Sequence, residues 1–204
     1  EAPVQFVTAA ADGRYPRNPN NRRTALTGPP ATKPELLALI NERWAALWQL
    51  VGALNDEEME RPLGDGWSPK VHAGHVTAWE RSLVALLRGQ HRGEAMGLPR
   101  ETWDAHDSGD ESSWPATGDA VNAALAAAAQ VQPLAEVLAQ SASTHAELLA
   151  LLGSMTQEDL DRPYSHYQPD NPPLNPAPVA GWIHGNTWEH YNEHIGWLEA
   201  GLRG

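Results

Sequence analysis

Two histidines near the C-terminus have the spacing of a pair of metal ligands. His190 and His194 are four residues apart, so in a helix their imidazoles lie one above the other on the same face. His75 lies on the apolar face of an earlier predicted helix, and helical bundles build metal sites from side chains on facing helices. Three neutral imidazoles without a fourth protein ligand leave coordination positions open, as in catalytic zinc sites. The ligand type alone does not choose among zinc, nickel, iron, manganese and cobalt.

Simpler interpretations exist for the same residue type. The chain has nine histidines, so an HxxxH pair can arise by chance, and a buried neutral imidazole can simply donate a hydrogen bond to a carbonyl. His145 is a rival fourth ligand that we interpret as a core residue. His72, at the predicted exposed start of its helix, and His184, away from the face of His190 and His194, are interpreted as surface or supporting groups.

Aromatic and polar residues around these histidines predict a small-molecule site. The chain has nine Trp but one Phe, and the interiors and ends of bundles are common ligand sites. We expect Trp67 and Trp79, with Trp103 and Trp114 from a loop, to line an apolar mouth, although packing in the core is the alternative for each. The polar groups near enough in sequence to orient a ligand are Asn186 and Tyr191, and the candidate general bases are Glu80 and Glu189.

Four amphipathic helices must position these residues. Apolar residues recur at spacings of three and four over residues 34–54, 68–89, 119–155 and 179–202, which is the helical period. Ser68 and Pro69 mark a helix start, and Pro133 divides the third stretch. Residues 89–118 and 164–178 are predicted loops. The sequence therefore predicts an all-α antiparallel four-helix bundle with two long loops and an extended N-terminal arm.

Length, charge and composition narrow the class of protein. The 204 residues suffice for one domain, predicted over residues 31–204, with residues 1–30 as an arm or tail. The net charge of −12 opposes binding to nucleic acid or to an anionic membrane. The absence of cysteine excludes thiolate metal sites and Cys nucleophiles. No apolar run approaches the roughly 20 residues of a spanning helix, and no leader pattern opens the chain, so we expect a soluble, cytoplasmic protein.

Two segments resemble the ClbS/DfsB family of the DinB-like superfamily. Residues 67–80, WSPKVHAGHVTAWE, are similar to the family pattern WSxKDxxAHLxxWE, with Val71 in place of its Asp. Residues 185–197, GNTWEHYNEHIGW, are similar to NTYEHYxEHIxWI, with Trp188 in place of Tyr. The opening at residues 32–37 also resembles the family's usual N-terminus. The resemblance covers about residues 31–204.

This resemblance implies an up-and-down bundle in which one histidine of the second helix and two of the last hold a divalent metal. The matching positions are His75, His190 and His194. Members of the family are associated with resistance to reactive, DNA-damaging small molecules, and the wider superfamily includes thiol-dependent transferases and isomerases.

The leading hypothesis is a metal-dependent enzyme, a hydrolase or detoxifying transferase, that acts on a small molecule. We expect no nucleic-acid or membrane partner, and a homodimer is compatible with the number of tryptophans. Two alternatives remain open. One is a non-catalytic protein that sequesters a ligand in the Trp-lined mouth, and the other is a structural bundle whose histidine cluster only stabilises the fold.

Overall fold

The computed structural model describes residues 30–64, 66–107, 114–170 and 175–203, which form helices and no strand. The long helices are α1 (Lys33–Val51), α3 (Pro69–Leu87), α6 (Trp114–Val131), α7 (Leu134–Ser154) and α11 (Trp188–Leu202). The short helices are α2 (Asp56–Glu60), α4 (Arg92–Ala95), α5 (Arg100–His106), α8 (Gln157–Asp161), α9 (Tyr164–Tyr167) and α10 (Ala180–Gly185).

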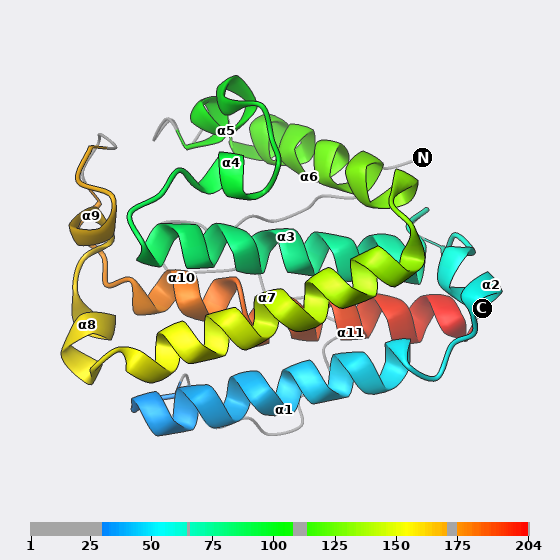
Figure 1. Ribbon diagram of the computed structural model, residues 1–204, viewed down its shortest axis with the longest axis horizontal. Coiled ribbons are helices and arrows are strands. Elements are labelled where there is room, and N and C mark those ends of the chain that lie inside the picture. The colour runs from blue at the N-terminus through cyan, green and yellow to red at the C-terminus, as the bar shows by residue number, and fades with distance from the viewer. Residues whose placement is uncertain (1–29, 65, 108–113, 171–174, 204) are drawn as a thin grey trace.

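Four rods make the bundle: α1, α3, α7 and the pair α10 and α11, which lie roughly alongside one another (Figure 1). Helix α3 packs between α7 and α6 and also contacts α11, while α1 packs on α11. Apolar residues from α1, α3, α7 and α11, such as Ile40, Leu83, Leu148 and Leu198, are fully buried in a common core. The predicted all-α antiparallel bundle is therefore confirmed.

Local sequence signals set the starts of the helices that matter for the site. The Ser68 hydroxyl accepts a hydrogen bond from the Val71 amide at 3.3 Å, and Pro69 occupies the first turn of α3. These features satisfy orphan amides and preset the helical φ. The division at Pro133 also occurs as predicted, because α6 ends at Val131 and α7 begins at Leu134.

The last helix is not continuous, which corrects the predicted helix over residues 179–202. It is interrupted at Asn186 and Thr187, between α10 and α11. The Asn186 amide donates to the carbonyl of Trp182 at 2.7 Å, and the Thr187 hydroxyl donates to that of Ile183 at 2.5 Å. Side-chain hydrogen bonds of this kind occupy helical carbonyls and favour an end or a bend.

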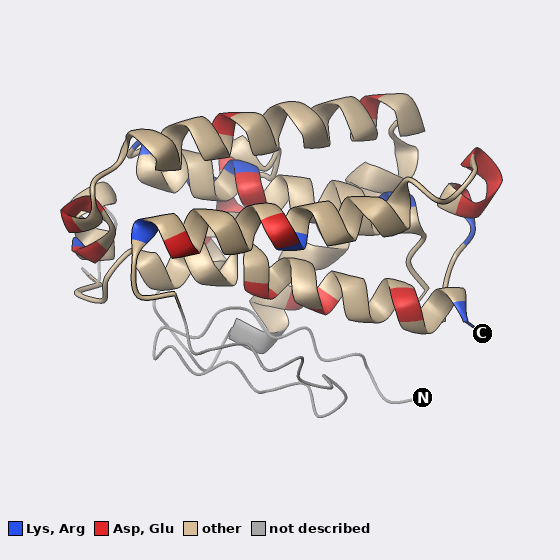
Figure 2. Ribbon diagram, turned by 90° about the horizontal axis from the view of Figure 1, so that it is seen from below, with Lys and Arg blue, Asp and Glu red and all other residues tan. Residues whose placement is uncertain are grey.

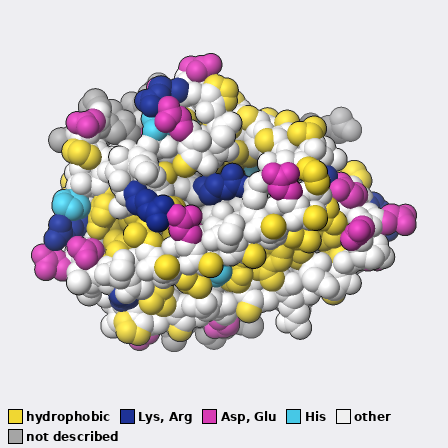
Figure 3. Space-filling view, viewed as in Figure 1, with side chains coloured by type: hydrophobic (Ala, Val, Ile, Leu, Met, Phe, Trp, Pro, Cys, Tyr) yellow, Lys and Arg dark blue, Asp and Glu magenta, His cyan; other side chains and the backbone are white. Residues whose placement is uncertain are grey.

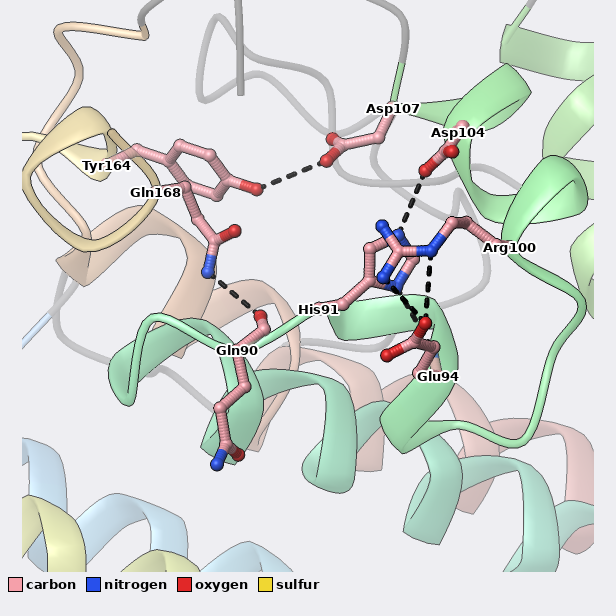
Figure 4. Close-up of polar contacts among 8 residues, drawn as sticks. All are labelled: Gln90, His91, Glu94, Arg100, Asp104, Asp107, Tyr164 and Gln168. Carbon is pink, nitrogen blue, oxygen red and sulfur yellow. Dashed lines mark hydrogen bonds and ion pairs between the residues drawn. The ribbon is translucent and has the colours of Figure 1, made fainter. Parts of the chain in front are cut away.

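The predicted loop over residues 89–118 is a second correction, because it contains α4, α5 and the start of α6, whose first residue is Trp114. Figure 4 shows polar contacts that tie this segment together: His91 contacts Asp104 at 2.9 Å, and Arg100 donates to Glu94 at 2.6 Å. Trp103 on α5 is only 3 % exposed. Met96, Leu98 and Trp103 pack against Ala78 and Trp79 of α3, and α4 and α5 are each too short to show a clear helical period in the sequence.

The outer surface is rich in small apolar side chains. In the space-filling view, hydrophobic side chains gather in a band over α7 and α1 (Figure 3), and several alanines of α7 are exposed. Among the described residues, no helix combines the length and apolarity needed to cross a membrane. Residues 1–29, assigned to the predicted arm, lie outside the described residues, so the domain boundary at residue 30 stays a prediction.

Gly74 permits the close approach of α3 to α6. A Cβ atom added at Gly74 would lie 2.6 Å from the Cβ of Ala129. We therefore expect Gly74→Ala to lower the free energy of unfolding by about 1–3 kcal/mol, the usual range for overpacking. The matched control is Gly153→Ala in α7, where nothing lies within 4 Å of the added Cβ. Urea unfolding followed by Trp fluorescence measures both, and equal stabilities would contradict this packing.

Candidate metal centre

Three imidazoles from two helices converge inside the bundle. His75 comes from α3, and His190 and His194 come from successive turns of α11. One ring nitrogen of each lies within 4.8 Å of the others. The Nε2 atoms of His190 and His194 are 3.1 Å apart. The ring centroid of His75 lies 5.1 Å from the ring centroid of each of these two histidines. The helical spacing provides the pair, and the packing of α3 on α11 provides the third group.

These histidines are held in the neutral form. Burial is the main cause that lowers the pKa of His75 and of His194 well below the usual value, with neighbouring histidines as a further cause. Burial, together with His72, lowers the pKa of His190 to about 3. A neutral imidazole keeps a lone pair on one nitrogen, which is the form that binds metals.

The geometry fits a divalent metal. Metal–nitrogen bonds of 2.0–2.1 Å in tetrahedral geometry place ligand nitrogens about 3.3 Å apart, close to the 3.1 Å between His190 and His194. The Nδ1 atoms of His75 and His190 are buried without a hydrogen-bond partner. For His190 the nitrogen that faces the cluster is Nε2, so the fit to an ion rests on the close approach of the ring nitrogens and not on these Nδ1 atoms.

Two tryptophans lie next to this cluster, and their predicted role in lining a ligand mouth stays a prediction. The ring centroid of Trp67 lies 4.9 Å from that of His75, and the centroid of Trp79 lies 6.2 Å from it on the same helix. Trp79 also approaches His190, at 6.3 Å, and Trp103 of α5, at 6.2 Å. The histidine cluster therefore has the aromatic rings of Trp67 and Trp79 as neighbours.

Two of the predicted site residues belong instead to a separate core network. The Tyr191 hydroxyl donates to Oε1 of Glu80, and the same oxygen lies 2.8 Å from Nδ1 of His145. The His145 ring stacks on Trp44, with centroids 3.7 Å apart and planes within 3°. Glu80 and Tyr191 are fully buried, because residues 80 and 75 lie on different faces of α3. We call Glu80, His145 and Tyr191 the core triad; its members do not join the histidine cluster.

The remaining predicted polar residues lie along α10 and α11. Asn186 is buried and caps α10 through its bond to the Trp182 carbonyl. Glu189, half-buried beside His190, has its pKa raised to about 7 by desolvation. Glu193 was not singled out from the sequence, but desolvation and then the charge of Glu189 raise its pKa to about 7 as well. Its i, i+4 spacing from Glu189 was the available signal.

His72 corrects the expectation of an exposed residue. It is only 1 % exposed, and its Nδ1 lies 2.9 Å from Nδ1 of His194. The ring of Trp67 covers it, with centroids 5.4 Å apart. The spacing of three residues from His75 places both on one face of α3, and this spacing was the overlooked signal.

Comparisons with known proteins agree with this architecture. An uncharacterised protein from Escherichia coli UTI89 is 17% identical, with a TM-score of 0.63 and coverage of 85% of this chain and 94% of its own. The colibactin self-resistance protein ClbS, solved in complex with a dsDNA, is 18% identical, with a TM-score of 0.61 and coverage of 85% and 97%. The sibling lethal factor precursor DfsB is 18% identical, with a TM-score of 0.59 and coverage of 86% and 97%.

At these identities the likeness concerns the fold. No curated protein matches the chain significantly. The sequence model described as the DinB superfamily matches residues 10–196, so its match begins within the stretch assigned to the arm. Because this model matches most of the chain, and because the structure is a helical bundle, the chain belongs to the DinB superfamily.

Proposed function

We propose that this protein is a metal-dependent enzyme that acts on a small molecule, as a hydrolase or a detoxifying transferase. The observation that carries the proposal is the convergence of three neutral imidazoles, the buried His75 and His194 and the partly exposed His190. A divalent metal supplies Lewis acidity, which polarises a carbonyl or lowers the pKa of water or of a thiol. The three-nitrogen donor set is compatible with zinc, nickel, iron or manganese.

The residues around the proposed centre have distinct roles in this scheme. The rings of Trp67 and Trp79 hold an apolar or planar part of the substrate against the histidines. Glu189 adjoins His190 on α11, and we keep it as the candidate general base because a carboxyl group whose pKa is about 7 can take up or release a proton near neutral pH. Its side chain is not part of the group of ligand atoms that lie within 4.8 Å of one another in the described residues. Glu80, the other candidate base, is engaged in the core triad, so we assign it no role in proton transfer.

The similarity to ClbS and DfsB supports a role in resistance to a reactive small molecule. ClbS is described as a colibactin self-resistance protein, and we propose the same kind of role for this chain without specifying the compound. ClbS was also solved with a dsDNA, so the fold does not by itself exclude nucleic acid. Here the charge of −12 opposes a DNA partner, and the few basic segments in Figure 2 lie apart from one another.

The test begins with metal content. We expect protein purified without a histidine tag to contain about one equivalent of a divalent metal by elemental analysis, and to lose it on dialysis against EDTA. Metal-loaded protein should hydrolyse p-nitrophenyl esters or transfer glutathione to 1-chloro-2,4-dinitrobenzene, and the metal-free protein should not.

The outcomes separate the candidate functions. Absence of metal, together with failure to take up Zn²⁺, Ni²⁺, Fe²⁺ or Mn²⁺, would contradict the proposal. Metal-independent quenching of Trp fluorescence by these compounds without turnover would favour the sequestering protein, in which Trp67 and Trp79 still contact the ligand.

A further inference from the structure

We infer that His72 is a positioning residue that fixes the tautomer and orientation of the metal ligand His194. This inference rests on the proposed metal site and assigns a second layer to it. The carrying observation is the 2.9 Å contact between the Nδ1 atoms of His72 and His194, two side chains that are 1 % and 0 % exposed.

The two nitrogens of His194 have different neighbours. Its Nε2 faces Nε2 of His190 at 3.1 Å, toward the cluster, whereas its Nδ1 faces His72. If Nε2 of His194 presents a lone pair to the metal, the ring proton must reside on Nδ1. The Nδ1–H of His194 then donates to Nδ1 of His72, which keeps the ligand nitrogen unprotonated.

His72 is placed to orient a ligand and not to act as one. It contacts the nitrogen of His194 on the opposite side of the ring from the His190 contact. The described cluster with ligand atoms within 4.8 Å contains His75, His190 and His194, without His72. Its ring also meets that of His194 in an edge arrangement, with centroids 5.0 Å apart and planes at 79°, which restricts rotation of the ligand.

The support is specific to His194. The Nδ1 atoms of His75 and His190 are buried without a hydrogen-bond partner, whereas Nδ1 of His194 lies 2.9 Å from Nδ1 of His72. Partners of this kind set the tautomer and basicity of metal-bound histidines, and their loss typically costs about 10–100-fold in metal affinity. We therefore expect His72 to control affinity without changing the donor set.

The experiment compares wild type with His72→Leu and His72→Gln. Zn²⁺ affinity is measured by competition with a chelator, and Co²⁺ absorption spectra report the donor set. We expect His72→Leu to bind Zn²⁺ about 10–100-fold more weakly and His72→Gln, whose amide oxygen can accept from Nδ1–H of His194, to recover most of the affinity. The Co²⁺ spectrum should keep its shape in both variants.

A metal-free measurement separates this inference from the proposed function. Nitrogen-15 NMR of the imidazoles should show His194 as the Nδ1–H tautomer in wild type and in His72→Gln, and a mixture of tautomers in His72→Leu. Unchanged Zn²⁺ affinity and tautomer in a folded His72→Leu would overturn the inference. A changed Co²⁺ donor set would also overturn it, because His72 would then be a ligand. Failure of wild type to bind metal would instead count against the proposed function.

Discussion

Replacing His75 with alanine is expected to weaken Zn²⁺ binding by more than about 100-fold, beyond the usual cost of losing a supporting residue. The substitution removes the only ligand nitrogen that α3 gives to the cluster and leaves His190 and His194, both on α11. The two imidazoles that remain come from one helix, so a bound metal would have two protein ligands in place of three and would no longer be held between α3 and α11. The measurement is a chelator competition titration at pH 7.5.

The matched control is His184→Ala, which also removes a partly buried histidine from the C-terminal part of the chain. His184 lies on α10 against Trp188, outside the histidine cluster, so its removal should leave Zn²⁺ affinity unchanged. His75→Asn, which keeps a polar side chain, guards against loss of folding, as judged by circular dichroism. Wild-type affinity in a folded His75 variant would show that the three imidazoles do not share an ion.

Much of this centre could be predicted from local sequence. The spacing of His190 and His194 requires that they share a face in any helix, and the apolar period of α3 places His75 inward. Ser68, Pro69 and Pro133 mark helix boundaries through their own backbone and side-chain chemistry, and the structure places α3 and the division between α6 and α7 accordingly.

The remaining features depend on contacts that no local pattern specifies. His72 stands in the first turn of α3, a position that is exposed in an isolated helix, but Trp67 and α11 cover it. Tyr191 adjoins His190 and Glu80 lies five residues after His75, so at about 100° of rotation per residue each points to a different face of its helix from the histidine. Their burial in the core triad required knowledge of the packing of α3, α7 and α11.

The interruption between α10 and α11 has a similar origin. Asn186 and Thr187 have poor helix propensity, but the apolar spacing continues through them and favours one helix. Their side chains turn back to the carbonyls of Trp182 and Ile183. This local competition ends α10 and sets the start of α11 at Trp188, two residues before His190.

The core triad predicts a large and separate effect on stability. Glu80→Ala is expected to lower the free energy of unfolding by about 1–3 kcal/mol for each buried group that it leaves without a hydrogen-bond partner. The carboxylate accepts from the Tyr191 hydroxyl and contacts Nδ1 of His145, and its removal leaves both groups buried without their partner. The control is Glu136→Ala on the exposed surface of α7, which should change stability by less than about 0.5 kcal/mol.

Glu80→Gln distinguishes the hydrogen bonds from the charge, and its effect depends on pH. Its amide oxygen can still accept from Tyr191 and His145, so the loss should be less than half that of Glu80→Ala. Burial is the main cause that raises the pKa of Glu80. A raised folded-state pKa means that the stability contributed by Glu80 is fully present below its unfolded pKa and falls as pH rises through the folded value.

Glutamine does not ionise, so the difference between wild type and Glu80→Gln should shrink as pH rises from about 4.5, near the unfolded pKa of glutamate, toward neutrality. Urea unfolding at several pH values measures this difference, and a difference that grows with pH would contradict the assignment. Because Glu80 and His75 lie on different faces of α3, folded Glu80→Gln should bind Zn²⁺ as wild type does. A loss of Zn²⁺ affinity would instead mean that the core triad and the histidine cluster are coupled through Tyr191, which adjoins His190 on α11.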